Sequence, residues 1–269
     1  MKGIADYRFI RLLGDGNHGR VWLAQPPPRL AIEVEHVAVK VLTVRVRDGD
    51  HGRVRDELAA YAAVSSPHLV PLYDAGHDGQ LVYATAYQLA GALDVAAAGL
   101  TARRAVQVVA CAARAAHALH EAGVAHRGIK PRNVFVTDEG GMLGDLGLTH
   151  LLNRGQTVTG IGPVGAIEYL APEMVSGVAG SRTADVWALG AKLHHALTGA
   201  SLYPGLLPGD LLASLRHLTT TRPLIDPDLD PATHGIIEAC LAPDPADRPQ
   251  TAAELAEHLD AMTTSDVPA

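Results

Sequence analysis

The sequence predicts an α+β protein with two lobes, a small β-rich N-lobe and a larger α-helical C-lobe. Two observations predict this division: β-branched residues in partial alternation fill much of the first 87 residues, and three- and four-residue apolar spacing dominates after Gly91. With 269 residues, 48% of them hydrophobic and 19% charged, the chain is long and apolar enough to form a sizeable core. We place the N-lobe at about 1–87, the hinge at about 86–91, the C-lobe at about 92–265 and a tail at 266–269.

The N-lobe opens with strand candidates. Two apolar segments between Tyr7 and Leu23 flank the sequence GDGNHGR, and a third candidate extends from Ala31 to Leu42. The proline run that begins at Pro26 and the polar stretch near Asp48 are typical of turns or exposed loops. The remaining elements expected here are a helix at 53–64 and strands at 69–73 and 81–87.

The C-lobe begins with a long helix. Thr101 is a suitable N-cap, apolar residues recur every three or four positions after it, and Gly123 is a suitable stop. Further helices are expected at 184–197 and 252–262, and Thr251 and Glu254 fit a capping box at the start of the second.

Composition excludes several functions. A net charge of −7 argues against a nucleic-acid binder, because phosphate-backbone binding requires a basic face. The longest Ala/Val-rich segment, 101–122, is interrupted by three arginines, so no membrane span is expected. The N-terminus lacks the apolar run of a signal peptide, and two cysteines are too few for a disulfide framework. The fourteen histidines show no zinc-ligand spacing. We expect a soluble, cytoplasmic protein.

A glycine-rich motif, Gly14-x-Gly16-x-x-Gly19-x-Val21, is the first chemical signal. Glycines let backbone N–H groups approach phosphate oxygens, although the motif alone could equally be a tight hairpin. A dinucleotide-binding turn would be followed by a helix and then by an acidic residue. Here a strand, VWLA, follows, and the next strand carries Ala-Val-Lys ending at Lys40, which is the order found in protein kinases.

Further motifs occur in the order found in that family and cover nearly the whole chain. They are Glu57 on the first helix, His126-Arg127-Gly128-Ile129-Lys130-Pro131-Arg132-Asn133, Asp145-Leu146-Gly147, Ala171-Pro172-Glu173, Asp185-Val186-Trp187-Ala188-Leu189-Gly190, and Arg248. The chain resembles the bacterial serine/threonine protein kinases of the eukaryotic (Hanks) type, with a bilobal kinase fold. The segments SSPHLVPLYDAG and IEYLAPE are especially similar to them.

The resemblance implies ATP and Mg²⁺ as ligands. It implies that Lys40, positioned by Glu57, holds the α- and β-phosphates, that Lys130 neutralises the γ-phosphate, and that Asn133 and Asp145 bind the metal. The residues that it places around the nucleotide are Gly14, Gly16, Gly19, Val21, Ala38, Lys40, Thr85, Ala86, Tyr87 and Phe135. Glu173, Asp185 and Arg248 are expected to be structural.

Three positions depart from the family pattern. Gly128 stands where the family has the aspartate that accepts the proton of the substrate hydroxyl. Ala166 stands where the family commonly has a threonine whose hydroxyl bonds that aspartate and the loop lysine, so both ends of one hydrogen bond are missing. His18 occupies the tip of the glycine-rich loop, where an aromatic residue is common.

The leading hypothesis is a pseudokinase that binds Mg-ATP and acts as a signalling or scaffold module. The alternative is a weakly active serine/threonine kinase. An interaction module without nucleotide and a small-molecule phosphotransferase rank below these two. Partners are expected among signalling proteins, including an active kinase acting on the 145–173 segment, where Thr157 and Thr159 are candidate acceptors and Arg127 could hold the phosphate.

Overall fold

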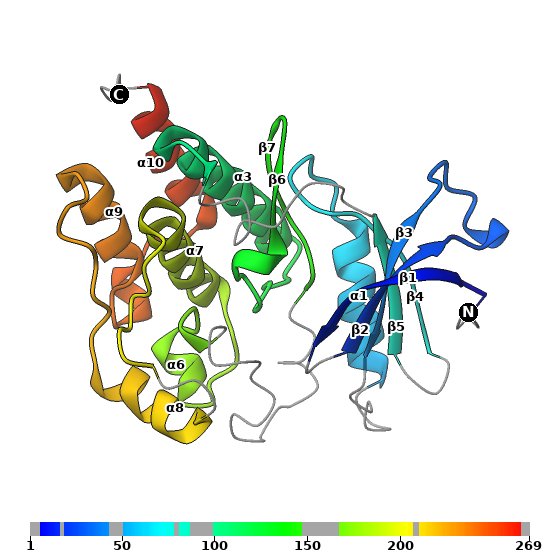
Figure 1. The fold of residues 1–269 in the computed structure, drawn as a ribbon, viewed down its shortest axis with the longest axis horizontal. Coiled ribbons are helices and arrows are strands. Elements are labelled where there is room, and N and C mark those ends of the chain that lie inside the picture. Colours follow the sequence, from blue (N-terminus) through cyan, green and yellow to red (C-terminus); the bar gives the residue numbers. More distant parts are fainter. Residues whose placement is uncertain are drawn as a thin grey trace.

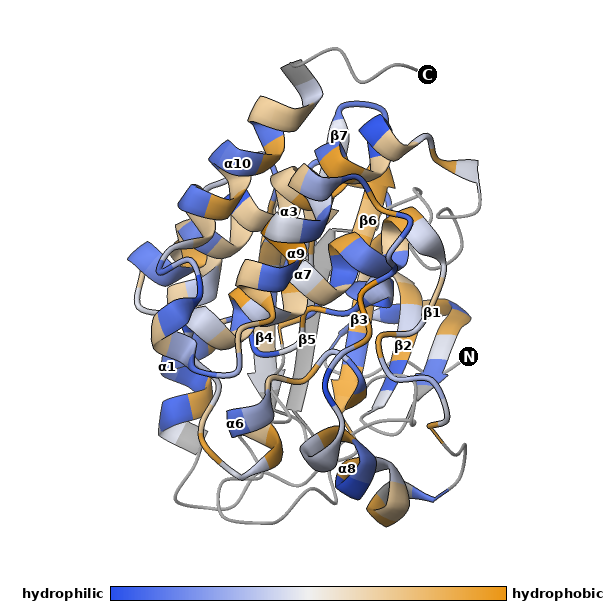
Figure 2. Cartoon of the chain, turned by 90° about the vertical axis from the view of Figure 1, so that its left-hand side faces the viewer, coloured by the Kyte–Doolittle hydropathy of each residue, from blue (hydrophilic) through white to orange (hydrophobic). Residues whose placement is uncertain are grey.

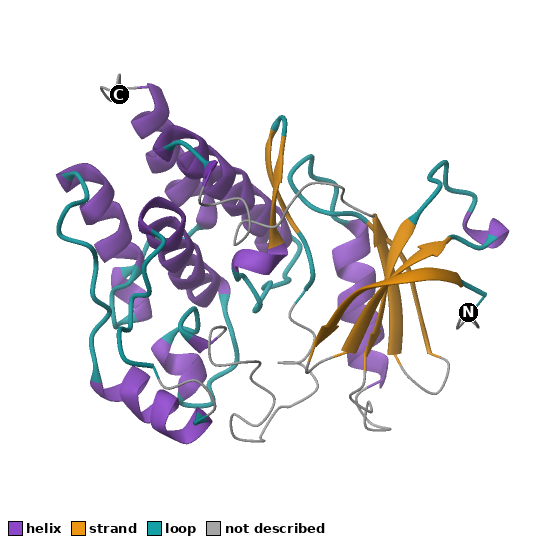
Figure 3. Cartoon of the chain, viewed as in Figure 1, coloured by secondary structure: helices purple, strands orange, loops and turns teal. Residues whose placement is uncertain are grey.

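The protein folds into two lobes, a five-stranded sheet with one long helix and a larger group of helices (Figure 1). The computed structural model describes residues 6–16, 19–42, 51–77, 81–86, 99–146, 167–206 and 210–264. Figure 3 shows the strands gathered in the first lobe and the helices in the second, with the β6–β7 hairpin beside the helices. The predicted fold class is confirmed.

The N-lobe sheet is antiparallel, with strand order β1-β2-β3-β5-β4. Its strands are β1 (Arg8–Gly16), β2 (Gly19–Gln25), β3 (Val37–Leu42), β4 (Leu72–His77) and β5 (Leu81–Ala86). The strand expected at 81–87 is confirmed within one residue, whereas the one expected at 69–73 starts three residues later. Leu69 instead forms an isolated parallel bridge with Leu143 of the C-lobe.

The strand expected from Ala31 is shorter than predicted. The chain after the prolines first forms a short 3-10 helix, η1 (Pro28–Leu30), and Ala31 adopts a left-handed conformation with φ 47° that interrupts an extended chain. The apolar residues that suggested a strand, among them Ile32 and Val34, pack instead against the small core on the sheet face that includes Val37 and Val39. Their hydrophobic pattern therefore reflects a loop that covers a sheet.

Helix α1 (His51–Ala63) lies on the side of the sheet that faces the helical lobe (Figure 1). Its buried residues Val54, Leu58 and Tyr61 recur at helical spacing, as expected for an amphipathic helix with one face in a core. Their core cluster also contains Leu42 of β3 and α3 residues, so α1 belongs to the core shared with the C-lobe. The helix predicted at 53–64 is confirmed.

Helix α3 (Ala102–Glu121) is central to the C-lobe and packs against α7, α10 and the β6–β7 hairpin. Thr101 caps it by accepting a hydrogen bond from the Arg104 N–H at 3.3 Å, and Gly123 follows it with φ 77°. The other C-lobe elements are η3 (Pro131–Asn133), β6 (Val134–Thr137), β7 (Gly140–Leu143), α6 (Pro172–Val175), α7 (Arg182–Thr198), α8 (Leu211–Thr220), α9 (Pro231–Cys240), η4 (Pro245–Asp247) and α10 (Ala252–Thr264).

Both later helices predicted from sequence are present as α7 and α10, each slightly longer than expected. The capping box of α10 is formed by Thr251, which accepts from the Glu254 N–H, while the Glu254 carboxylate reaches back to the Gln250 N–H. Figure 2 shows hydrophobic colouring along β3 and β6, and hydrophilic residues on α1 and α10. Among the described residues, no helix is both long and apolar enough to cross a bilayer.

Candidate functional site

The glycine-rich motif lies at the adjoining ends of β1 and β2, where Gly16 pairs with Gly19. Gly19 has φ 142°, and a Cβ there would lie 2.2 Å from the backbone oxygen of Val41, so this glycine is required by the packing of β2 on β3. A Cβ at Gly14 would meet nothing within 4 Å. The motif can therefore be a tight hairpin and bind phosphate as well. Gly19 is needed for the packing of the hairpin strand β2 on β3.

Lys40 lies on β3 opposite Val21 of β2. Its Nζ contacts Oδ1 of Asp145, and both side chains are partly buried. Because Asp145 follows β7 in the C-lobe, this ion pair joins the two lobes across the site. The structure therefore brings together the predicted phosphate-binding lysine and one of the two predicted metal ligands.

Glu57 differs from the prediction. Its carboxylate contacts the guanidinium of Arg127, and no ion pair joins it to Lys40 among the residues that the structure describes. The two side chains are only 13% and 15% exposed, so solvent screens their attraction less than that of an exposed pair. Arg127 also donates from Nε to the carbonyl oxygen of Gly180, and its backbone has φ 59°. The expected Lys40–Glu57 pair is wrong for this conformation, because both residues have other partners.

The loop before η3 is fastened to α7 through Asp185. The buried carboxylate of Asp185 accepts hydrogen bonds from the backbone N–H groups of His126 at 2.7 Å and Arg127 at 2.8 Å. It also accepts one from Nε2 of His120 at 2.8 Å. These bonds satisfy the carboxylate and fix the loop, which confirms the expected structural role of Asp185.

His126 connects this loop to the Asp145 segment. Its Nε2 lies 3.1 Å from the carbonyl oxygen of Gly144 and donates to it, because a carbonyl can only accept. Burial lowers the pKa of the imidazole, a direction that the nearby Asp185 and Asp145 carboxylates oppose. The ring is therefore neutral and acts as a fixed donor.

Asn133 holds the loop and Asp145 in register. Its Nδ2 donates to the carbonyl oxygens of Gly128 at 2.7 Å and Asp145 at 3.2 Å. With the amide nitrogen so engaged, the amide oxygen is the atom that could face a ligand. Amide and carboxylate oxygens are hard donors of the kind that Mg²⁺ prefers, but the Asp145 carboxylate already contacts the Lys40 ammonium, so Asn133 and Asp145 do not fit a metal in this conformation.

Lys130 adds a second cation to the site. Burial lowers the pKa of its ammonium, and the neighbouring charges of Lys40 and Arg132 lower it further, while the Asp145 carboxylate raises it. Lys130 therefore lies near Lys40, Arg132 and the Asp145 carboxylate. The arrangement is chemically suited to bind phosphate oxygens.

The other residues predicted around the nucleotide come from both lobes, on β2, β3 and β5 of the N-lobe sheet and on β6 of the C-lobe hairpin. Val21 on β2, Ala38 on β3 and Phe135 on β6 are all half-buried. Thr85 and Ala86 lie at the end of β5, where Thr85 pairs with Ala38. The predicted residues outside the described part of the chain are His18, Tyr87, Gly147, Thr157, Thr159 and Ala166.

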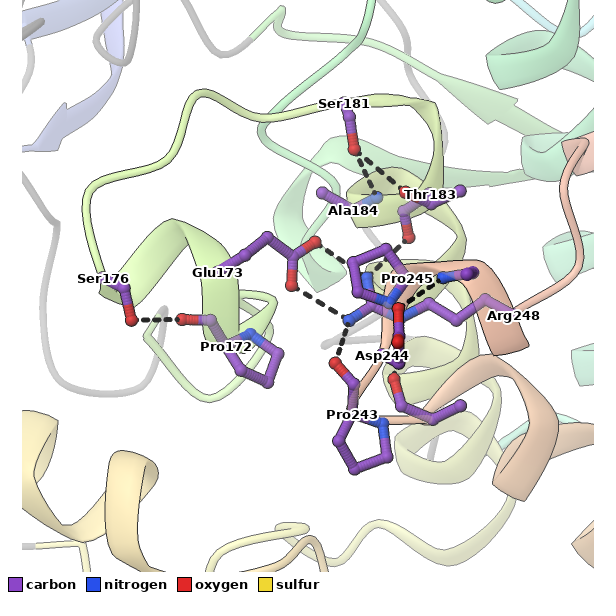
Figure 4. A network of polar contacts seen from close by, with 12 residues as sticks. Pro172, Glu173, Ser176, Ser181, Thr183, Ala184, Pro243, Asp244, Pro245 and Arg248 are labelled. Carbon is purple, nitrogen blue, oxygen red and sulfur yellow. Dashed lines mark hydrogen bonds and ion pairs between the residues drawn. The ribbon is translucent and has the colours of Figure 1, made fainter.

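Figure 4 shows the second predicted ion pair, between Glu173 and Arg248. The guanidinium donates to both carboxylate oxygens, at 2.8 and 2.9 Å, and also to backbone carbonyls that include Thr183 and Pro243. It lies 4.9 Å from the ring centroid of Trp187 on α7. This confirms the structural role expected for the pair.

Sequence reasoning missed a second contact between this segment and α7. Lys192 is fully buried, and its Nζ lies 3.1 Å from the ring centroid of Tyr169, while His195 meets the same ring edge-on. The signal was a lysine next to the apolar run Val186–Leu189 of α7, where burying a charge is costly. Lys192 thus holds Tyr169 against α7, while Trp187 of the same helix packs against Arg248.

A family model and the curated relatives of the chain indicate the same protein family. The chain matches a protein kinase domain model over residues 7–259. It is 33% identical to serine/threonine-protein kinase PknD of Mycobacterium tuberculosis over 97% of this chain and 40% of that protein. It is 32% identical to PknH of the same species and to PknJ of Mycobacterium bovis, over 93% and 94% of this chain and 41% and 44% of those proteins. The chain thus spans less than half the length of these relatives.

Proposed function

Because the chain belongs to the protein kinase family, we propose that it is a pseudokinase, which binds ATP but transfers its phosphate slowly or not at all. The resemblance implies Mg²⁺ on Asn133 and Asp145, whereas in the structure the Asp145 carboxylate contacts Lys40. The nucleotide is held by the chain's own residues: Lys40 and Lys130 attract phosphate oxygens, and the glycines leave room for them.

One observation carries this proposal: the loop around Gly128 is held in place by hydrogen bonds, but residue 128 has no carboxylate side chain. Asn133 bonds the Gly128 carbonyl, and Asp185 holds the two preceding N–H groups. The three carboxylates that meet this region in the described residues are all engaged: Glu57 by Arg127, Asp145 by Lys40, and Asp185 by backbone N–H groups and His120. Each would have to leave its partner before it could accept a hydroxyl proton.

A general base contributes about a hundred- to ten-thousand-fold to rate, so its loss does not by itself abolish transfer. Phosphoryl transfer depends strongly on positioning and charge neutralisation. Lys130 is retained beside Asp145, and this observation favours the second candidate function, a weakly active serine/threonine kinase. The two candidates differ only in residual rate.

Thermal unfolding with and without ATP and Mg²⁺ tests the binding half of the proposal. A ligand that binds only the folded state raises the midpoint, by mass action. A rise that saturates with ATP is expected, and an unchanged midpoint at saturating ATP would contradict the proposal. Lys40→Met is the matched variant, and its rise should be smaller because one phosphate-binding cation is lost.

Transfer of radiolabelled phosphate tests the chemical half. The wild-type chain should show at most trace labelling of itself or of a generic protein substrate. The double variant Gly128→Asp with Ala166→Thr should label faster, whereas Gly128→Asn with Ala166→Thr adds a similar side chain without a base and should not. If the wild type already matches the aspartate variant, the chain is the weakly active kinase.

We further propose a signalling role in the cytoplasm, with partners that include an active kinase acting on residues 145–173. Arg127, a predicted holder of an added phosphate, contacts Glu57 in the structure. A phosphate bound there would therefore compete with Glu57. Mass spectrometry of the native protein, with Thr157→Ala and Thr159→Ala as comparisons, tests whether the segment is modified.

A further inference from the structure

We propose that this site takes the nucleotide as a metal-free polyphosphate, because Lys40 occupies the carboxylate that a metal would need. The inference rests on the proposed nucleotide binding and specifies the form of the ligand. It arises from one exchange of partners: Glu57 binds Arg127, and Lys40 binds Asp145.

The first step concerns Glu57, which is held away from Lys40. Its partner Arg127 is fixed by two hydrogen bonds besides the ion pair: its backbone N–H donates to Asp185, and its Nε donates to the carbonyl oxygen of Gly180. Both partners are largely buried, so the pair persists at physiological ionic strength. Lys40 therefore has no access to the Glu57 carboxylate while this pair is formed.

The second step concerns Asp145. Its Oδ1 contacts the Lys40 ammonium, and its backbone carbonyl oxygen accepts a hydrogen bond from Asn133 Nδ2. A divalent cation on the same carboxylate would lie within a few ångströms of that ammonium and would repel it. Metal and Lys40 therefore compete for Asp145, whereas in a Lys40–Glu57 arrangement they would not.

The third step concerns the charges around Lys130. Lys40 and Arg132 lie close enough to lower the pKa of its ammonium, while Asp145 raises it. A free polyphosphate adds negative charge beside these cations, whereas a metal adds positive charge. The same cations thus favour the phosphates and disfavour the metal.

Calorimetric titration of the full chain with ATP, once in EDTA and once in excess Mg²⁺, tests the inference. The dissociation constant in EDTA should equal or lie below the value in Mg²⁺. If binding in EDTA is weaker by more than about 5-fold, the lower end of typical coupling between two ligands, the inference is wrong and nucleotide binding still stands. Absence of binding in both buffers would instead contradict the proposed function.

A matched pair of variants tests the cause. Arg127→Ala frees the Glu57 carboxylate for Lys40, so Mg²⁺ should then strengthen ATP binding by at least about 5-fold. Glu57→Gln breaks the same ion pair without offering Lys40 a carboxylate, so its ATP binding should stay independent of Mg²⁺. Equal behaviour of the two variants would overturn the partner exchange. Unliganded melting curves establish that each is folded.

A nucleotide-free measurement makes the test independent of Arg127→Ala. Binding of Mn²⁺ to the protein alone, followed by electron paramagnetic resonance, should strengthen by at least about 5-fold in Lys40→Met, because the competing ammonium is gone. Asp145→Asn in the same background should remove the gain. Unchanged Mn²⁺ affinity in Lys40→Met would overturn the competition.

Discussion

Arg248 grips Glu173 through two parallel hydrogen bonds of 2.8 and 2.9 Å, with the arginine side chain completely buried. Planar two-point pairing of this kind combines charge with fixed geometry. The pair joins the end of the 167–173 segment to the chain before α10, so its loss would affect two distant parts of the C-lobe.

Glu173→Gln should destabilise the protein by about 3–5 kcal/mol, because it leaves the buried guanidinium without its counter-charge. Urea unfolding followed by circular dichroism measures the change. Asp15→Asn is the matched control, since the Arg20–Asp15 pair is exposed and contributes less than about 1 kcal/mol. Similar losses for the two variants would show that burial is not the decisive factor.

Two glycines of the same motif should respond differently to alanine. Gly19→Ala should cost about 1–3 kcal/mol, because a Cβ would collide with the Val41 carbonyl at an unfavourable φ. Gly14→Ala should change the free energy of unfolding by less than about 0.5 kcal/mol, because its surroundings are open. Urea unfolding separates them. If Gly14→Ala is as destabilising as Gly19→Ala, the motif is a purely structural hairpin.

Stability should fall as the pH drops below about 6.5, the ordinary histidine pKa. Burial lowers the pKa of both His126 and His194 in the folded state, so the unfolded chain binds protons that the folded chain does not. The loss continues down to the folded-state pKa values, with a slope of up to about 1.4 kcal/mol per pH unit for each histidine.

The contacts explain why both rings stay neutral. Nε2 of His126 already donates to Gly144, and its Nδ1 is buried without a hydrogen-bond partner in the described part of the chain. Nε2 of His194 accepts from the Asp226 N–H at 3.1 Å and would lose that bond on protonation. His126→Gln and His194→Gln can keep these bonds without titrating, so each should flatten the pH profile of unfolding. An unchanged profile in both variants would exclude them as its source.

Lys192 and Tyr169 should be energetically coupled. Tyr169→Leu removes the ring face from a buried ammonium, whereas Tyr169→Phe keeps it. A double-mutant cycle with Lys192→Met should give a coupling of about 1–2 kcal/mol for the leucine variant and far less for phenylalanine. Additive losses in the leucine cycle would mean that the ring and the ammonium do not stabilise each other.

The sequence predicted the main helices and the order of the lobes because local signals encode them. Thr101, Gly123 and Thr251 mark helix ends, and apolar periodicity fills the space between them. Helices α8 and α9 and the β6–β7 hairpin were not predicted, because they are short, with ten residues in each helix and four in each strand. The segment 31–36 was misassigned because a loop that covers a sheet has the same apolar spacing as a strand.

The sequence predicted which residues form the site, but it did not predict which of them pair with one another. Lys40, Asn133 and Asp145 do lie together, as their place in the motifs indicated. The partner of Glu57 depends on how far α1 lies from β3 and from the loop at Arg127, which is a property of lobe packing. The contact of buried Lys192 with Tyr169 could not be predicted either, because nothing in the sequence of α7 identifies Tyr169 as its neighbour.

The 126–133 loop is held through main-chain atoms of residues 126 to 128. Two backbone N–H groups donate to Asp185, and the carbonyl oxygen of Gly128 accepts a hydrogen bond from Asn133. None of these bonds depends on the side chain at position 128. The shape of the loop and its capacity for chemistry are therefore set by different atoms, and a carboxylate could be lost from or returned to this position while the surrounding architecture stays intact.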